Sequence, residues 1–180
     1  MSEPTFAIII MGASGSGKTT LGRRLARQIG ASLVEGDEYH LPTCVTKMRS
    51  GVPLDDDDRW PWLDRLADVI NDRSVRERTI VCTCSALKRR YRDRLRLAVR
   101  QPICFVCLHA NKALLETRLA ERLGHYMPPS LLRSQLDILE LPKDETDSIT
   151  LSAAESPDDL VLSVLDSLKS GALRPGSPQQ

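Results

Sequence analysis

Apolar residues follow two different spacings along the chain, and these spacings predict strands and helices in alternation. A continuous apolar run at 6–11 predicts a strand buried on both faces, as in a parallel sheet. Shorter runs predict further strands at 31–34, 79–84, 103–108 and 148–151. Apolar residues about one helical turn apart predict helices at 18–29, 59–71, 86–100, 114–123, 130–140 and 158–168. Together they predict an α/β fold, with a five-stranded, mostly parallel sheet covered by helices on both faces.

Length and punctuation predict a single domain over residues 1–170. The chain has 180 residues, about the length of one domain, and shows no internal repeat or central linker. Glycine and prolines between two predicted helices predict a short mobile lid near 118–130. The Pro-, Gly- and Gln-containing end predicts a disordered tail over 171–180.

The composition fits a packed protein that acts on small molecules. Hydrophobic residues make up 41% of the chain, and 25 Lys and Arg residues against 24 Asp and Glu give a net charge of +1. A charge this close to zero disfavours a general nucleic-acid or membrane-surface binder. No apolar run approaches a bilayer span, and the first five residues do not form a signal peptide. We therefore expect a cytoplasmic protein with neither nucleic acid nor membrane as a partner.

Five cysteines could suggest redox or metal chemistry, but their surroundings predict a structural role. Four of them lie in apolar runs. Cys104 and Cys107 have the spacing of a redox or metal motif, yet the residues around them predict a strand and not the turn that such a motif needs. We interpret all five as buried thiols.

The strongest motif is a phosphate-binding loop. Residues 12–19, Gly-Ala-Ser-Gly-Ser-Gly-Lys-Thr, match G-x-x-x-x-G-K-[ST] between a buried strand and a helix. Its backbone N–H groups and the helix N-terminus present positive potential to phosphates. Lys18 should reach the β- and γ-phosphates, and the Thr19 hydroxyl should bind Mg²⁺. The motif predicts ATP and Mg²⁺ as cofactors. The residues expected to hold the nucleotide are Gly12, Ala13, Ser14, Gly15, Ser16, Gly17, Lys18, Thr19 and Thr20.

Acidic residues at the end of the second predicted strand supply further parts of a phosphoryl transfer. Ligands of open α/β sheets bind at the carboxyl ends of strands, so Glu35 and Asp37 should face the phosphate loop. Asp37 is suited to orient or deprotonate an acceptor hydroxyl, and Glu35 to hold a Mg²⁺-bound water. The third strand ends in Ser85 where many P-loop proteins carry a metal-binding aspartate. Mg²⁺ would then depend on Thr19, the phosphates and waters, with an acid from the Glu35/Asp37 pair.

Arginines supply candidate positive charge. Arg118 and Arg122 lie four positions apart on a predicted helix that leads into the predicted lid. We expect Arg118 to contact ATP and Arg122 to act in catalysis. Basic residues also crowd 88–100, but they spread around the helix with only Tyr91 nearby, which disfavours nucleic-acid binding. Those at its start, Lys88 and Arg92, could face an anionic substrate.

Specific stretches outside the phosphate loop allow a family to be recognised. They are Gly36-Asp37-x-x-His40, Lys47-Met48, Gly51-x-Pro53-Leu54-x-Asp56-x-Asp58-Arg59-x-Pro61-Trp62-Leu63, Cys84-Ser85-Ala86-Leu87-Lys88, Tyr91-Arg92-Asp93 and Gly124-His125-x-Met127. With these motifs, residues 7–169 resemble the gluconokinases (gluconate kinases) of the small P-loop type.

The resemblance implies transfer of the ATP γ-phosphate to the 6-hydroxyl of D-gluconate, with Mg²⁺. The product, 6-phospho-D-gluconate, would feed the pentose phosphate pathway. The resemblance also implies a P-loop NTPase fold of the shikimate-kinase-like or adenylate-kinase-like type, and a homodimer. It makes Asp37 the group that orients or deprotonates the 6-hydroxyl. Further candidate contacts to the sugar acid are His40, Lys47, Arg59, Lys88, Arg92 and His125.

The chain departs from the family pattern in two places. Glu35 stands where many members have Asp, which lengthens the arm toward the metal. The acidic run 55–58 exceeds the pattern, and we interpret Asp55 and Asp57 as part of a helix N-terminus.

Two other functions stay open from the residues alone. One is a kinase for another small acceptor, such as shikimate or a nucleoside monophosphate. A shikimate kinase should show a glycine triplet after the third strand, where this chain has Ser85-Ala86-Leu87. The other is a non-catalytic ATP-dependent sensor, which would bind ATP without turning over a sugar acid.

Overall fold

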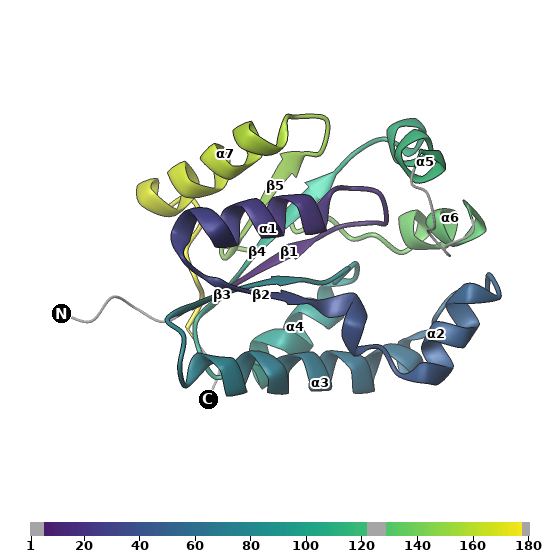
Figure 1. The fold of residues 1–180 in the computed structure, drawn as a ribbon, viewed down its shortest axis with the longest axis horizontal. Helices are drawn as coiled ribbons and strands as arrows, with labels where there is room; N and C mark the ends of the chain where they lie inside the picture. The colour runs from purple at the N-terminus through teal and green to yellow at the C-terminus, as the bar shows by residue number, and fades with distance from the viewer. Residues whose placement is uncertain (1–5, 122–128, 178–180) are drawn as a thin grey trace.

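The computed structural model describes residues 6–121 and 129–177, and it forms a parallel sheet between two layers of helices (Figure 1). The strands are β1 (Phe6–Met11), β2 (Ser32–Glu35), β3 (Thr79–Thr83), β4 (Ile103–His109) and β5 (Ser148–Ser152). Their order across the sheet is β2-β3-β1-β4-β5, and every pairing is parallel. The described part of the chain therefore confirms the predicted five-stranded α/β architecture.

Helices cover both faces of the sheet. They are α1 (Lys18–Ile29), α2 (Pro42–Arg49), α3 (Asp56–Ser74), α4 (Arg89–Ala98), α5 (Lys112–Ala120), α6 (Pro129–Asp137) and α7 (Pro157–Ser170). In Figure 1, α1 and α7 lie above the sheet and α3 and α4 below it, whereas α2, α5 and α6 gather at one end. That end is where β1 to β5 finish, so it carries the loops that can form a site.

The position of β1 in the middle of the sheet explains why its sequence is a continuous apolar run. Side chains alternate between the two faces of a strand. In β1, Ile8 and Ile10 pack with Leu21 and Leu25 of α1, while Ile9 faces the opposite core with Leu63 of α3. Both faces are dry, because Ile8, Ile9 and Ile10 have no exposed surface.

Two short helices were not predicted. A 3₁₀-helix spans Gly36–Tyr39, and α2 follows at Pro42–Arg49. Both are too short to show a clear apolar period, and α2 buries Cys44 and Met48 in a small separate cluster. The helix predicted at 59–71 begins earlier, at Asp56, because Asp55 caps it. The Asp55 side chain accepts from Asp58 N–H and Asp58 Oδ2 accepts from Asp55 N–H, which confirms the interpretation of Asp55 as part of a helix N-terminus.

The tail differs from its prediction over 171–177. Leu173 is 1% exposed and packs in the core shared by α1 and α7. Gly176 exchanges two backbone hydrogen bonds with Ile103 at the start of β4. One apolar residue and a free backbone position on the sheet were enough to order a segment whose composition predicts disorder. Residues 178–180 lie outside the described residues.

Candidate active site

The loop between β1 and α1 has the backbone geometry that its sequence predicts. Gly12, Gly15 and Gly17 have φ of 140°, 80° and 96°. A Cβ at Gly12 would lie 2.4 Å from the carbonyl oxygen of Leu108. A side chain is therefore excluded there both by the conformation and by the neighbouring strand. The loop turns tightly at the carboxyl end of β1 and delivers the chain into α1 at Lys18.

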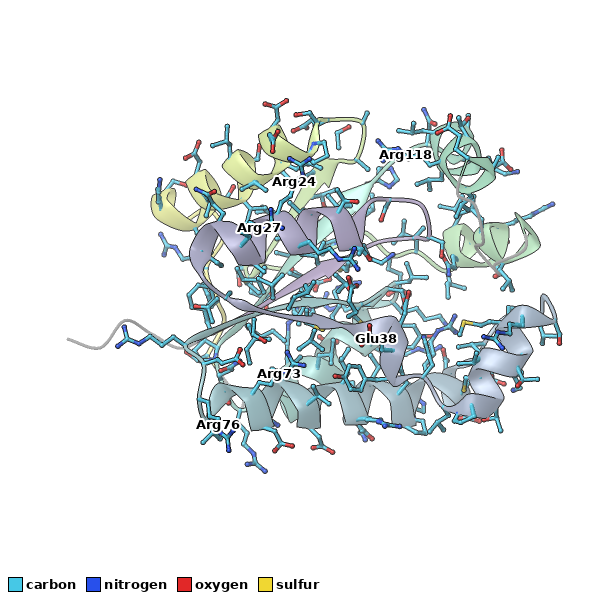
Figure 2. The ribbon with its side chains drawn as sticks, viewed as in Figure 1. Arg24, Arg27, Glu38, Arg73, Arg76 and Arg118 are labelled. Atoms are coloured by element: carbon cyan, nitrogen blue, oxygen red, sulfur yellow. The ribbon has the colours of Figure 1, made fainter. Side chains whose placement is uncertain are left out.

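A cavity lies against this loop. Residues 14–21 form one side of it, and Arg118 of α5 and Ala153 after β5 form parts of the other. Figure 2 shows Arg118 extending from α5, and a Cβ placed on Gly17 would lie 4.0 Å from its Nη1 atom. The Lys18 Nζ atom donates to the carbonyl oxygens of Gly12 and Ala13, each at 3.1 Å. The lysine ammonium is thereby held against the loop that it is expected to serve.

The residues predicted to hold the metal lie together. The Thr19 hydroxyl donates to Glu35 Oε2 at 3.1 Å, and the Thr83 hydroxyl donates to the same oxygen at 2.7 Å. The other oxygen, Oε1, is buried and accepts no hydrogen bond among the described residues, although Arg23 Nε lies 3.5 Å away. A hydroxyl beside a carboxylate with one buried, unsatisfied oxygen fits Mg²⁺ and its bound waters. Thr83 was not predicted, because a threonine in a strand carries no sequence signal for this role.

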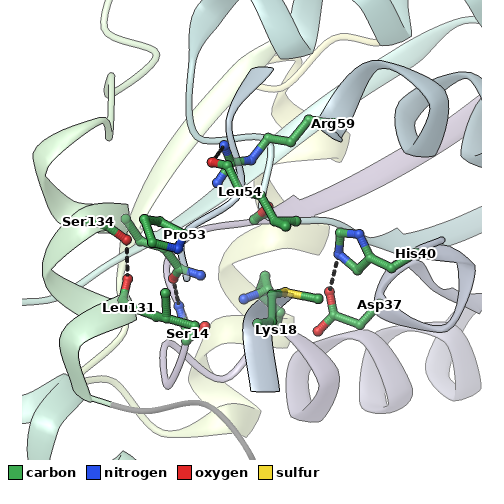
Figure 3. A pocket seen from close by; sticks show the side chains of 12 residues that line it. Ser14, Lys18, Asp37, His40, Pro53, Leu54, Arg59, Leu131 and Ser134 are labelled. Carbon is green, nitrogen blue, oxygen red and sulfur yellow. Dashed lines mark hydrogen bonds and ion pairs between the residues drawn. The ribbon is translucent and has the colours of Figure 1, made fainter. Parts of the chain in front are cut away.

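A second cavity adjoins the first and is lined in part by residues of α2 and α6 (Figure 3). Ser14, Lys18 and Asp37 line both cavities. The remaining residues that line the second cavity are His40, Met48, Pro53, Leu54, Arg59, Ser85, Leu131, Ser134 and Gln135. Their mixture of charged, polar and apolar groups suits a small polar acceptor.

Asp37 and His40 lie on one wall of the second cavity. The Asp37 side chain is 69% exposed, and its Oδ1 atom lies 3.9 Å from His40 Nε2. The His40 ring stacks on Trp62 with 4.1 Å between ring centroids, and Trp62 Nε1 donates to Gly36 O at 2.8 Å. Burial lowers the pKa of His40 below 6.5 even though the Asp37 carboxylate favours the charged form. His40 is therefore neutral at pH 7, beside an ionisable and accessible carboxylate.

Arg59 is the buried cation of this cavity. It is 8% exposed and lines the cavity from the first turn of α3. Its Nη1 atom donates to the carbonyl oxygens of Leu54 and Asp55 and to the Tyr91 hydroxyl. These contacts fix the guanidinium at the cavity wall, as a site for an anion requires.

Two predicted substrate contacts are paired elsewhere. Lys47 Nζ lies 2.7 Å from Asp58 Oδ1, and Lys88 Nζ lies 2.9 Å from Asp56 Oδ1. Neither lysine is among the residues that line the second cavity. Both ion pairs join a neighbouring element to the first turn of α3, so in this structure the lysines have a structural role beside the site.

Arg92, a third predicted substrate contact, also lies outside the lining of the second cavity. It has no exposed surface, and its guanidinium is bound by Glu145, with Nε 2.9 Å from Oε2. Its Nη1 atom donates to Ala86 O at 3.0 Å. Ala86 has φ of 40°, and it directly follows Ser85 at the cavity. The donors of the Arg92 guanidinium are used by the Glu145 carboxylate and by carbonyl oxygens of the loop after β3, and Arg92 does not line the second cavity.

The other predicted residues have simple outcomes. All five cysteines are buried and free, which confirms their structural interpretation. Arg122, His125 and most of the predicted lid lie outside the described residues. The missed lining residues Met48, Pro53, Leu54, Leu131, Ser134 and Gln135 come from segments that carry no motif for nucleotide chemistry. Met48, Pro53 and Leu54 do lie in stretches that resemble the family, and Ser85 ends a strand at the functional edge of the sheet, so these four residues had a sequence signal.

Comparisons with known proteins agree with this geometry. The model of the AAA domain family matches residues 8–142. A gluconokinase from Gluconobacter oxydans is 44% identical over 156 residues, which cover 87% of this chain and 86% of the relative. The chain belongs to the gluconokinase family. A crystal structure of a gluconokinase from Sinorhizobium meliloti superposes with a TM-score of 0.81 at 40% identity, covering 95% of each chain.

More distant structures share the fold alone. A shikimate kinase from Acinetobacter baumannii has a TM-score of 0.57 at 20% identity, over 94% of each chain. The predicted shikimate-kinase-like P-loop fold is thus confirmed, and the chain is a phosphotransferase of the gluconokinase family. No helix among residues 6–121 and 129–177 is long and apolar enough to cross a bilayer.

Proposed function

We propose that this chain transfers the γ-phosphoryl group of ATP to the 6-hydroxyl of D-gluconate where the two cavities meet. One observation carries the proposal: Ser14, Lys18 and Asp37 line both cavities, in a chain of the gluconokinase family. A group that passes from a nucleotide to an acceptor must cross a boundary that both molecules touch. Those three residues form that boundary.

The nucleotide side supplies charge stabilisation. The phosphate-loop N–H groups and Lys18 hold the β- and γ-phosphates, and Arg118 adds positive charge from α5. Thr19 and Glu35 are the residues that would hold Mg²⁺, directly or through its waters. When bound, the metal neutralises charge on the phosphates. Among the described residues no group of three or more His, Cys, Asp or Glu forms a metal site of its own, which fits a metal held largely by ATP and water.

The acceptor side supplies the proton chemistry. Asp37 is exposed to the cavity and takes the proton of the acceptor hydroxyl as the oxygen attacks phosphorus. The new O–P bond forms while the bond from phosphorus to the β,γ-bridging oxygen breaks, and ADP leaves with that oxygen. Arg59 provides a buried cation for the carboxylate of gluconate, and neutral His40 provides a polar contact for a sugar hydroxyl.

The test is release of ADP from ATP and Mg²⁺ with D-gluconate, beside shikimate, AMP and buffer alone. Gluconate-dependent release, with 6-phosphogluconate detected as product, is the expected result. Turnover with a different acceptor would contradict the proposed substrate. ATP binding without turnover of any acceptor would favour an ATP-dependent sensor.

Assembly and location are proposed on narrower grounds. A homodimer follows from family resemblance alone, and light scattering on the purified chain tests it. A cytoplasmic location is supported by five buried free thiols, which fit a reducing compartment. Cell fractionation tests the location.

A further inference from the structure

Helix α6 touches both halves of the site. Leu131, which is 3% exposed, packs with Met48 of α2 and with Leu54. Both of these residues line the second cavity, called the acceptor cavity from here on. The next residue, Leu132, is fully buried against Ala13 of the phosphate loop and Leu115 of α5. A single turn of helix therefore rests on the acceptor wall and on the nucleotide loop at once.

Gln135 adds a polar link one turn further along α6. It lies four residues after Leu131, so the two share a helix face, and both line the acceptor cavity. The backbone N–H of Ser14 donates to Gln135 Oε1 at 2.7 Å. Ser14 is one of the residues that line both cavities. The carboxamide thus meets the phosphate loop at the boundary that the transferred group must cross.

We propose that Gln135 is a positioning residue for phosphoryl transfer, an inference that rests on the proposed function. Its hydrogen bond sets the turn at Ser14 relative to the acceptor wall that α6 supports. In-line attack needs the acceptor oxygen and the γ-phosphorus in fixed register, and small misplacements are costly. The side chain is also neutral where both ligands, ATP and a sugar acid, are anions. A neutral hydrogen-bond acceptor can hold the phosphate loop without repelling either ligand.

Gln135→Met tests the hydrogen bond. Methionine matches the length and helix preference of glutamine but offers no comparable hydrogen-bond acceptor. We expect kcat to fall about tenfold, the equivalent of one lost hydrogen bond, while KM for ATP stays within about twofold. The matched control is Asp137→Asn, an exposed change on the same helix, which should leave both constants unchanged. A kcat for Gln135→Met within twofold of the unmodified chain would overturn the proposal.

Gln135→Glu tests the need for a neutral group, and it keeps the acceptor oxygen if the methionine variant fails to fold. The added negative charge should raise KM for ATP or for gluconate at least about fivefold, with the thermal midpoint unchanged. A residue that only packs the helix would not separate KM from stability in this way. Values of KM for both ligands within twofold of the unmodified chain would overturn the proposed location between two anions.

The proposed function and the role of Gln135 can fail separately. If the unmodified chain does not phosphorylate gluconate, the same variants are compared on the acceptor, or on the ATP hydrolysis, that it does support. A tenfold lower kcat for Gln135→Met in that reaction would support the positioning role while the proposed substrate is rejected. Equal rates there would reject the positioning role as well.

Discussion

The two cavities that meet at Ser14 are built in different ways. The nucleotide cavity is formed mostly by one continuous stretch, residues 14–21. The acceptor cavity draws residues from the 3₁₀-helix, α2, α3, the loop after β3 and α6. A contiguous site depends on local geometry, whereas a dispersed site depends on the contacts that bring its parts together.

This difference changes what a charged residue does. On the nucleotide side Lys18 and Arg118 line the cavity themselves. Around the acceptor cavity, Lys47, Lys88 and Arg92 are bound to Asp58, Asp56 and Glu145, and they hold the frame in which Arg59 and Asp37 are presented. Substitutions in the first group should change rates, and substitutions in the second should change stability first.

Lys18→Ala should give the largest effect. The ammonium that faces the transferring phosphoryl group is lost, so we expect kcat to fall about 10³-fold or more with the fold retained. Steady-state kinetics and a thermal unfolding curve measure both quantities. Lys169→Ala, an exposed change at the end of α7, is the control. Near-normal turnover in Lys18→Ala would contradict the expectation that charged residues lining the nucleotide cavity control the rate.

Glu145→Gln should show the opposite behaviour, a stability effect first. Arg92 and Glu145 have side chains only 1% and 5% exposed, so neutralising one partner leaves a buried charge without its ion pair. We expect a loss of about 3 kcal/mol in the free energy of unfolding, measured with denaturant at pH 7. Glu116→Gln, which breaks the exposed pair with Lys112, should cost about 0.5 kcal/mol or less. An equal loss of unfolding free energy in the two variants would contradict a structural role for the buried ion pair of Arg92.

The pH dependence of stability sharpens the same point. Burial alone would raise the pKa of Glu145, but hydrogen bonds from Arg92 and Arg96 lower it below 4.5. A depressed carboxylate pKa means that its stabilising contribution is complete above pH 4.5 and is lost as pH falls through the folded-state value. In this acid range, the free energy of unfolding should therefore change less with pH for Glu145→Gln than for the unmodified chain. An unchanged acid slope would show that Glu145 is not stabilised as a carboxylate.

The same contrast explains what the sequence could predict. The phosphate loop, the parallel sheet and the proximity of Thr19 to Glu35 follow from local patterns and from the rule that sites lie at the ends of parallel strands. The sequence suggested Arg92 as a substrate contact because it lies near the start of a basic helix and in a stretch that resembles the family. Its partner Glu145 lies 53 residues away in sequence and only the fold brings them together. Gln135 was missed for the same reason, since its contact with Ser14 spans 121 residues.

Asp37→Asn should lower activity without the stability cost of Glu145→Gln. Asparagine cannot take the acceptor proton, so we expect kcat to fall about 100-fold with ATP affinity retained, as measured by kinetics and by calorimetric titration of a non-hydrolysable ATP analogue. Glu38→Gln, an exposed change next in the chain, is the matched control. An unaltered kcat would exclude Asp37 from the proton transfer and leave its side of the boundary without a base.

His40→Gln, which keeps a polar group at the cavity wall, should give the smallest effect, seen most clearly in the pH dependence of stability. Because burial lowers the pKa of His40 below its unfolded value of 6.5, the folded chain disfavours the charged imidazole. The stabilising contribution of neutral His40 should be complete above pH 6.5 and should decline as pH falls from 6.5 toward the lower folded-state pKa. His40→Gln should lack this decline, whereas His109→Gln, at an exposed position, should keep it.

The Asp37→Asn variant also tests the contact between Asp37 and His40. The Asp37 carboxylate raises the pKa of His40 against the effect of burial, so Asp37→Asn should lower that pKa further. The chain has three histidines, which makes their ring protons readily assigned by NMR in a pH titration. A His40 titration that does not move in Asp37→Asn would mean that the two side chains do not interact in solution. The acceptor wall would then be assembled differently from the arrangement in which Asp37 lies 3.9 Å from the imidazole.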